Sequence, residues 1–369
     1  MKEELRRGIK RPLNGLFLLL GIILMTGLFV YVHTDQYETF EIKNKSEAIE
    51  VDGALLPYQI VNSDEGDAVY QNLLKQKSVL ARQLNSVLFN QPKKYISTSQ
   101  ELTNLRLDLR QETSFEEELS FLQPSLESVL KDEAYYTYLA EQEEEVILKP
   151  ESIASLTILF LTVLGVIWFP ICAFLTANIL EDEYEHTSLI KGQPQPFMKR
   201  MMKKFSVLYL FFVVSLLGAF LVGGVLTQFL GNPVNDLSHV NAIQLMSFVI
   251  LKNWQIICAY FIYLSILFLF GFTLSVLLNI VFRNFYLTLI IELAFYGLTI
   301  LLPDFIAQAP WYIGSYIVPS YLFNGNYLTD TSSGLLNPVV GSLYLLVASG
   351  LLSMLASLLS KRGLKGVKN

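Results

Sequence analysis

Six long apolar runs alternate with polar segments along this chain. A helix needs about 20 mostly apolar residues to cross the hydrocarbon core of a bilayer. The runs cover residues 13–32, 153–180, 205–230, 255–282, 285–302 and 338–359. The pattern predicts an all-α polytopic membrane protein with six transmembrane helices, a short segment 1–12 before the first and a tail 360–369 after the last.

Two stretches beside these runs need their own interpretation. The apolar stretch 245–282 is too long for one straight crossing, and Lys252, Asn253 and Trp254 interrupt it. Because Trp and Lys prefer the membrane interface, we expect an interfacial helix up to about residue 252 and a span after it. Residues 305–325 are rich in aromatic residues and proline, which predicts short re-entrant or interfacial helices at the outer surface.

The segment 33–152 is the only sizeable soluble region. Apolar residues recur at a spacing near 3.6 from residue 67 onward, which predicts amphipathic helices. Residues 36–61 are more β-like and suggest a short hairpin. Thr98 and Glu101 fit a capping box, with Thr98 as the N-cap of a helix. We expect a small, mainly helical domain inserted between spans one and two.

The distribution of charge predicts the orientation. Only 16% of the residues are charged and 52% are hydrophobic, whereas soluble domains carry about 25% charged residues. Basic residues gather before the first run, in the loop 181–204 and in the tail, while 33–152 is strongly acidic. The positive-inside rule therefore places both termini in the cytoplasm and residues 33–152 outside. The first run is longer than a signal-peptide core and is read as a retained anchor.

Several kinds of chemistry are not expected. No Gly-x4-Gly-Lys-Ser/Thr phosphate loop occurs, so nucleotide hydrolysis by that route is excluded. The three histidines, His33, His186 and His239, are far apart in the sequence and predict no metal site. Cys172 and Cys258 lie in apolar runs and are read as small apolar residues. We expect no catalytic residue, no cofactor in this chain and no nucleic-acid partner.

An ionisable group within a span is costly and is a functional candidate by default. Glu292 lies about two turns into the fifth run, and Asn279 lies near the end of the fourth. Two roles are open for Glu292: it lines a translocation path, or it forms a hydrogen bond that joins neighbouring helices. Asn279 is a second path candidate, for which a structural role is also open.

The loop between the second and third runs is acidic first and basic afterwards. A short helix with carboxylates in its first turn is suited to dock in a cleft of a partner. The alternative is a solvated loop with ordinary positive-inside lysines. The candidate coupling residues are Glu181, Asp182, Glu183, Glu185, His186, Thr187, Ser188, Leu189 and Pro194.

This layout resembles the ABC-2 type permeases of ABC transporters, in particular bacterial exporters with an extracellular domain between the first two spans. The loop departs from the family pattern where Thr187-Ser188 replaces Gly-Thr, which leaves the register of the coupling helix open. The resemblance implies two ABC ATPase subunits that bind ATP and Mg²⁺. It also implies a second permease, either a copy of this chain or a similar one, in the lipid of a bacterial plasma membrane.

The expected function is export of a peptide, such as a bacteriocin or pheromone, or of another amphipathic or hydrophobic compound. Two other classes are open: a membrane sensor or immunity protein that binds a ligand through its outer domain, and an intramembrane enzyme that depends on Glu292. The acidic face of 33–152, which includes Glu116–Glu118 and the stretch Glu141–Glu145, is either a solvated surface or an attraction for a cationic peptide.

Overall fold

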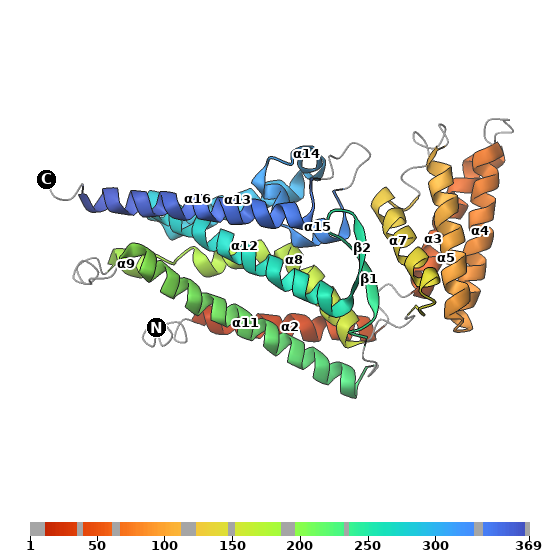
Figure 1. Ribbon diagram of the computed structural model, residues 1–369, viewed down its shortest axis with the longest axis horizontal. Coiled ribbons are helices and arrows are strands. Elements are labelled where there is room, and N and C mark those ends of the chain that lie inside the picture. The colour runs from red at the N-terminus through yellow and green to blue at the C-terminus, as the bar shows by residue number, and fades with distance from the viewer. Residues whose placement is uncertain are drawn as a thin grey trace.

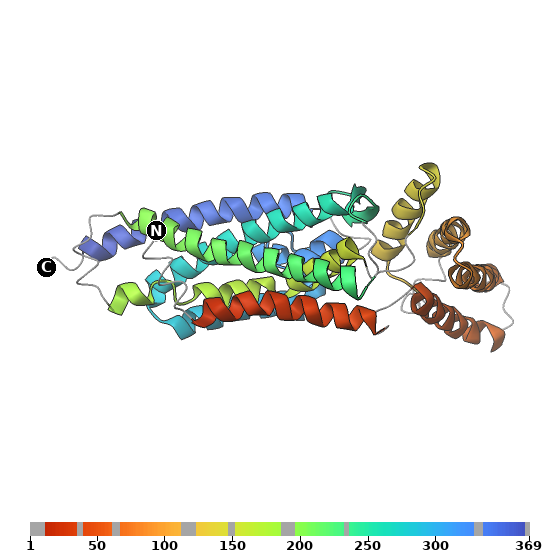
Figure 2. The ribbon, with the colours of Figure 1, turned by 90° about the horizontal axis from the view of Figure 1, so that it is seen from below.

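The computed structural model describes residues 12–34, 40–60, 67–111, 123–146, 152–185, 196–231, 236–327 and 335–365. Within these ranges the regular secondary structure is helical except for one two-stranded hairpin. A bundle of long helices makes up most of the length, and a smaller group of helices, the head domain (described residues of 40–146), lies at one end (Figures 1 and 2). We call the two ends of the bundle the hairpin end, beside the head domain, and the α9 end, opposite it.

Five helices of the bundle are long and apolar enough to cross a membrane. Large apolar side chains, such as Leu221 on the third of them and Val347 on the last, are exposed on their outer faces, as expected for helices surrounded by lipid. The chain is therefore a multi-pass membrane protein. The five helices are α2 (Pro12–His33), α8 (Ile153–Thr176), α11 (Phe197–Phe229), α12 (Asn253–Phe282) and α16 (Pro338–Lys365).

A sixth apolar helix, α13 (Phe285–Leu301), occupies the predicted fifth span but has only 17 residues. At 1.5 Å per residue it is about 25 Å long, shorter than a hydrocarbon core of roughly 30 Å. A tight turn at the polar pair Arg283-Asn284 precedes it. Arg283 adopts a left-handed conformation with φ 52°, and the Asn284 side chain accepts a hydrogen bond from the Leu287 N–H at 3.2 Å.

The predicted interfacial helix before residue 252 is wrong. The chain forms β1 (Val240–Gln244) and β2 (Phe248–Lys252), which pair antiparallel with Val240 opposite Lys252. A short apolar run cannot be assigned to a helix or a strand by periodicity alone. Here the run Phe248–Leu251 contains two β-branched residues, which favour the strand.

The expected short helices after α13 are confirmed as secondary structure. They are α14 (Pro303–Gln308), the 3₁₀ helix η3 (Ile313–Tyr316) and α15 (Pro319–Asn324). Tyr263 of α12 donates a hydrogen bond to the carbonyl of Tyr316 at 2.8 Å, and the ring of Phe323 stacks on Tyr260. These contacts hold the short helices against α12.

The head domain consists of α3 (Phe40–Ile60), α4 (Asp67–Leu88), α5 (Pro92–Gln111) and α7 (Leu126–Glu141). The amphipathic helix predicted from residue 67 is confirmed, but the hairpin suggested for 36–61 is wrong. Val51, Ala54 and Leu55 of α3 are buried together against the next helix. This helical spacing of buried positions outweighs the β propensity of the segment.

The capping box at Thr98 is also wrong. Helix α5 begins at Pro92, and proline is favoured at the first helical position because it lacks an N–H to satisfy. Thr98 therefore lies inside the helix, where its hydroxyl donates to the carbonyl of Lys94 at 2.9 Å. Glu101 instead forms an ion pair with Arg82 of α4 at 2.7 Å.

The head domain rests on the hairpin. Tyr136 and Leu139 of α7, together with Val146, form a buried apolar cluster with Val240 of β1, and Ile250 of β2 packs against it. Figure 1 shows α7 between the hairpin and the other helices of the head domain. The hairpin is thus the platform that connects the two parts.

Asp236 anchors the helices of the bundle at the hairpin end. Its carboxylate accepts hydrogen bonds from the backbone N–H groups of Ala154 (2.9 Å) and Ser155 (3.1 Å) and from the hydroxyls of Ser152 and Ser155. The backbone carbonyl of Asp236 accepts a hydrogen bond from the side-chain amide of Asn253 at 2.9 Å. A carboxylate at a helix N-terminus satisfies free N–H groups and interacts favourably with the helix dipole.

Replacing Asp236 with alanine should lower the free energy of unfolding by roughly 2 kcal/mol, because buried N–H groups lose their acceptor. Thermal unfolding of the purified chain in detergent measures the change. Asp52→Ala is the control, since Asp52 forms an ion pair of 2.7 Å with Lys77 but both side chains are about half exposed. That change should cost less than about 1 kcal/mol. Equal shifts for the two variants would contradict the anchoring role.

Candidate functional site

The candidate coupling segment is a short helix, α9 (Glu181–Glu185), that follows α8 after one turn. Ile179 and Leu180 in that turn are buried, and the Tyr184 N–H donates to the Leu180 carbonyl at 3.1 Å. Glu181 and Glu183 are described with their side chains, and Asp182 and Glu185 with their backbone only. His186, Thr187, Ser188, Leu189 and Pro194 lie outside the described residues.

Glu183 faces the bundle. Its carboxylate forms ion pairs with Arg200 at 3.0 Å and with Lys204 at 3.1 Å, both on α11. The three side chains are between 11% and 19% exposed, so the pairs are partly shielded from water. Lys204 also donates to the carbonyl of Ile179 at 2.7 Å. This ion-pair cluster ties α9 and the preceding turn to the start of α11.

The cluster explains why the third long helix begins before its apolar run. The prediction started the span at residue 205, whereas α11 starts at Phe197 and includes the segment 199–204, in which four of six residues are basic. Arg200 and Lys204 are four residues apart and therefore lie on one helix face. That face meets Glu183, so part of the acidic-then-basic pattern is an internal contact.

Tyr184 connects α9 to α12. Its hydroxyl donates to the carbonyl of Asn279 at 2.8 Å, and its ring packs against the main core of the bundle. Burial raises the pKa of the Tyr184 phenol, so the hydroxyl remains a neutral donor at physiological pH. The short helix is thus bonded to two different long helices and follows directly from a third.

Asn279 is fully buried and bonds inside the protein. Its amide donates to the carbonyl of Ala177 at 2.7 Å and to that of Ser275 at 2.8 Å. It therefore joins α12 to the turn between α8 and α9. Of the roles left open for Asn279, this geometry favours the structural one.

Glu292 of α13 is connected to Asn279 through Ser275 of α12. It is fully buried, and one carboxylate oxygen accepts a hydrogen bond from the Ser275 hydroxyl at 2.6 Å. The Ser275 hydroxyl is 2.6 Å from that of Thr176, which bonds the carbonyl of Cys172. These contacts run from α13 through α12 to α8, so the Glu292 side chain helps to join three helices by hydrogen bonds. Within the described ranges, the second oxygen of Glu292 and the Thr288 hydroxyl have no hydrogen-bond partner.

The two roles open for Glu292 predict different effects when the residue is replaced. Glu292→Gln keeps an acceptor for Ser275 and should change stability by less than about 1 kcal/mol, whereas Glu292→Leu removes it and should cost about 1–2 kcal/mol. Unfolding in micelles measures both. If Glu292→Gln instead abolished transport while stability was unchanged, a role in the translocation path would be favoured over packing.

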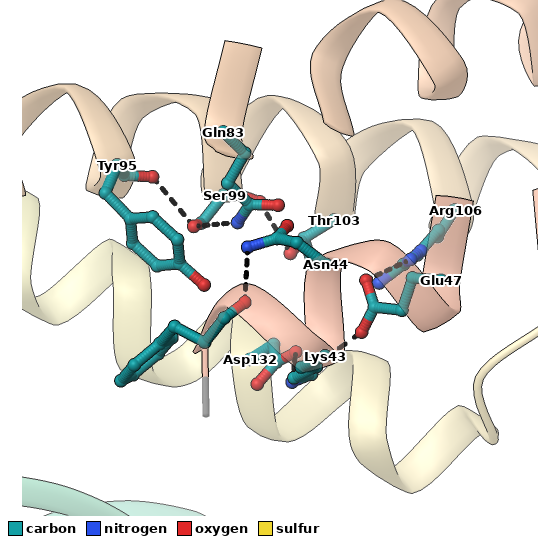
Figure 3. Close-up of polar contacts among 10 residues, drawn as sticks. Lys43, Asn44, Glu47, Gln83, Tyr95, Ser99, Thr103, Arg106 and Asp132 are labelled. Atoms are coloured by element: carbon teal, nitrogen blue, oxygen red, sulfur yellow. Dashed lines mark hydrogen bonds and ion pairs between the residues drawn. The ribbon is translucent and has the colours of Figure 1, made fainter. Parts of the chain in front are cut away.

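The head domain holds a buried polar cluster that the sequence did not reveal (Figure 3). Arg106 of α5 forms an ion pair with Glu47 of α3 at 2.7 Å, with the two side chains 5% and 11% exposed. Lys43 lies 3.8 Å from Glu47 and 3.4 Å from Asp132 of α7. The cluster therefore connects three helices of the head domain. Its members are up to 89 residues apart in sequence, so no local motif marks them.

The cluster perturbs the groups around it. Burial by itself lowers the pKa of Lys43, but the carboxylates of Asp132 and Glu47 outweigh it and raise that pKa above its ordinary value. Burial raises the pKa of Tyr95 to about 12. Lys43 is thus held as a cation and Tyr95 as a neutral phenol at physiological pH, which suits a structural network.

The networks described above consist of hydrogen bonds and ion pairs between helices. Among the residues that the structure describes, no three His, Cys, Asp or Glu side chains gather closely enough to hold a metal ion. The α9 contacts instead form a mechanical connection between a short terminal helix and the long helices of the bundle. Comparison of the chain with protein-family models, curated proteins and solved structures found no match.

Proposed function

We propose that this chain is the transmembrane permease subunit of an ATP-driven ABC exporter. The observation that carries the proposal is the attachment of α9. Glu183 bonds to α11, Tyr184 bonds to α12, and the buried turn 177–180 continues from α8. A partner that displaces α9 would therefore act on three long helices together, as rigid-body switching requires.

The exposed side of α9 supports the same proposal. Glu181 is exposed, while Glu183 and Tyr184 face the bundle. One side of the short helix is thus fixed to the bundle and another is open to a partner. This arrangement fits a helix that lies in a cleft of a separate ATPase subunit, which would supply the ATP and Mg²⁺ site that this chain lacks in its sequence.

The proposed orientation follows from charge. Arg200 and Lys204 lie at the α9 end, and basic residues also close α16. By the positive-inside rule the α9 end is cytoplasmic and the head domain is outside a bacterial plasma membrane. In this proposal α13 completes a six-span permease, which pairs with a second copy or a similar chain and exports a peptide or another amphipathic compound.

Co-purification tests this proposal. A tagged chain, solubilised gently and expressed with the ATPase encoded by a neighbouring gene, should retain that ATPase in a stable complex and stimulate its ATP hydrolysis. A soluble tagged protein expressed with the same ATPase is the control. If no nucleotide-binding subunit is retained, a membrane sensor or immunity protein becomes the better explanation.

A further inference from the structure

A cavity of about 470 Å³ lies between the head domain and the hairpin end of the bundle. Helices α3 and α7 of the head domain form one wall, and α8, the hairpin and α15 form the other. This volume is within the range of ligand pockets, about 300–1,000 Å³.

One face of α7 runs along the cavity. Lys131, Tyr135 and Leu139 are spaced four residues apart and all line it, and Glu144 and Glu145 line it beyond the end of the helix. Residues with this spacing share one helix face. Along this face the cavity meets, in order, a cation, an aromatic ring, an apolar side chain and two carboxylates, and the paired Lys43 and Asp132 line the same wall.

The cation at one end is poorly compensated. Its nearest described partner is the neutral amide oxygen of Asn324, 3.4 Å from the Lys131 ammonium. Asp132 is already paired with Lys43 at 3.4 Å. Burial lowers the pKa of Lys131, and the Asp132 carboxylate offsets this only in part, so the surroundings disfavour the charge of Lys131. An anionic group entering the cavity would supply the missing partner.

The carboxylates at the other end are also open to a ligand. Glu144 and Glu145 form no ion pair within the described part of the chain, and Glu145 is exposed. The backbone N–H of Glu144 bonds the Leu139 carbonyl at 3.0 Å, which fixes this end of the wall. The ten helical steps from Lys131 to Glu141 rise about 15 Å, so the cation and the two carboxylates come from opposite ends of the α7 wall.

We propose that this cavity binds a short peptide in an extended conformation. Its terminal carboxylate would pair with Lys131, and a cationic group would lie near Glu144 and Glu145. About five residues at roughly 3.3 Å each cover that separation. Ile158 and Leu159 of α8 line the opposite wall and would contact apolar side chains.

The separation of charge selects this ligand over a lipid. A purely anionic amphiphile would be repelled by the two glutamates at the far end. A zwitterionic headgroup carries its opposite charges only a few bonds apart and cannot reach both ends. The proposal concerns binding alone and holds whether or not the chain works with an ATPase.

The test is to measure peptide binding by calorimetry on the purified full-length chain in nanodiscs, without ATP or any partner protein. The probe is the hexapeptide KALFAL with a free C-terminal carboxylate, and its C-terminal amide is the matched control. We expect the amide to bind about tenfold more weakly, because it loses one charge-assisted hydrogen bond. This comparison needs no variant and so does not depend on one folding.

Variants locate the contact. Lys131→Gln should bind the acid and the amide equally, Lys131→Arg should keep the tenfold difference, and Lys77→Gln, at an exposed ion pair away from the cavity, should behave as the unmodified chain. Glu144→Gln with Glu145→Gln should remove the preference for KALFAL over QALFAL.

Three results would overturn the proposal. The first is no binding of any probe at millimolar concentration. The second is an unchanged preference for the acid in Lys131→Gln that melts at the same temperature as the unmodified chain. The third is displacement of the peptide by phosphatidylglycerol, which would assign the cavity to lipid. None of these bears on whether an ATPase binds at α9.

Discussion

In the proposed exporter, charge reversal at Glu183 should reduce substrate-stimulated ATP hydrolysis by the complex more than tenfold. In Glu183→Lys a third cation meets Arg200 and Lys204, which now lie 3.0 and 3.1 Å from the carboxylate. Like charges at this distance repel, most strongly where the groups are shielded from water. The start of α11 would separate from α9, and movement of α9 would no longer reach that helix.

The measurement is substrate-stimulated ATP hydrolysis by the reconstituted complex, with ATPase concentration varied. Glu183→Lys should lower the maximal rate. Glu181→Lys makes the same charge change on an exposed side chain of the same helix, so it should raise the ATPase concentration needed and leave the maximal rate nearly unchanged. Adding Arg200→Glu to Glu183→Lys restores one opposite pair and should recover part of the rate. Equal effects at residues 181 and 183 would contradict transmission through Glu183.

The long apolar helices were predictable because their signal is local. An apolar run of membrane length allows few alternatives, since each backbone polar group in lipid needs an internal partner. The turn at Arg283 and Asn284 was visible for the same reason, as a polar pair between two apolar runs. Helix α13 has 17 residues, fewer than the roughly 20 that a span needs. Its crossing of the membrane is therefore still a prediction.

The wrong secondary-structure predictions concern segments whose structure is decided by contacts with residues distant in the sequence. Residues 248–252 became a strand because β1 and the head domain cover it, and residues 40–60 became a helix because α4 buries one of its faces. Neither neighbour can be read from the segment itself. The candidate site could be predicted only in part for the same reason. The sequence indicated the charged loop, but the pairing of Glu183 with Arg200 and Lys204 depends on how α11 packs.

The buried ion pair of the head domain should dominate the stability of that domain. Among the described residues, Arg106→Ala leaves the Glu47 carboxylate, 11% exposed, with Lys43 at 3.8 Å as its one remaining ion-pair partner. Removing one partner of a buried pair costs about 3–5 kcal/mol, because a charge remains buried without compensation. We expect a loss near the lower value, since Lys43 offsets part of the charge.

The chain offers a matched control at the same bond length. Arg82 and Glu101 also join neighbouring head-domain helices at 2.7 Å, but their side chains are 46% and 48% exposed. Water screens such a pair, so Arg82→Ala should cost less than about 1 kcal/mol. Denaturant unfolding followed by near-UV circular dichroism of the head-domain tyrosines measures both variants.

A double replacement separates charge from packing. Arg106→Met with Glu47→Leu removes both buried charges and keeps most of the volume, so it should recover much of the stability lost in Arg106→Ala. If the cost came from lost volume alone, Arg106→Met by itself would be as stable as the double variant. If Arg82→Ala and Arg106→Ala cost the same, burial would not be the cause. Recovery only in the double variant would show that the uncompensated charge of Glu47 causes the loss.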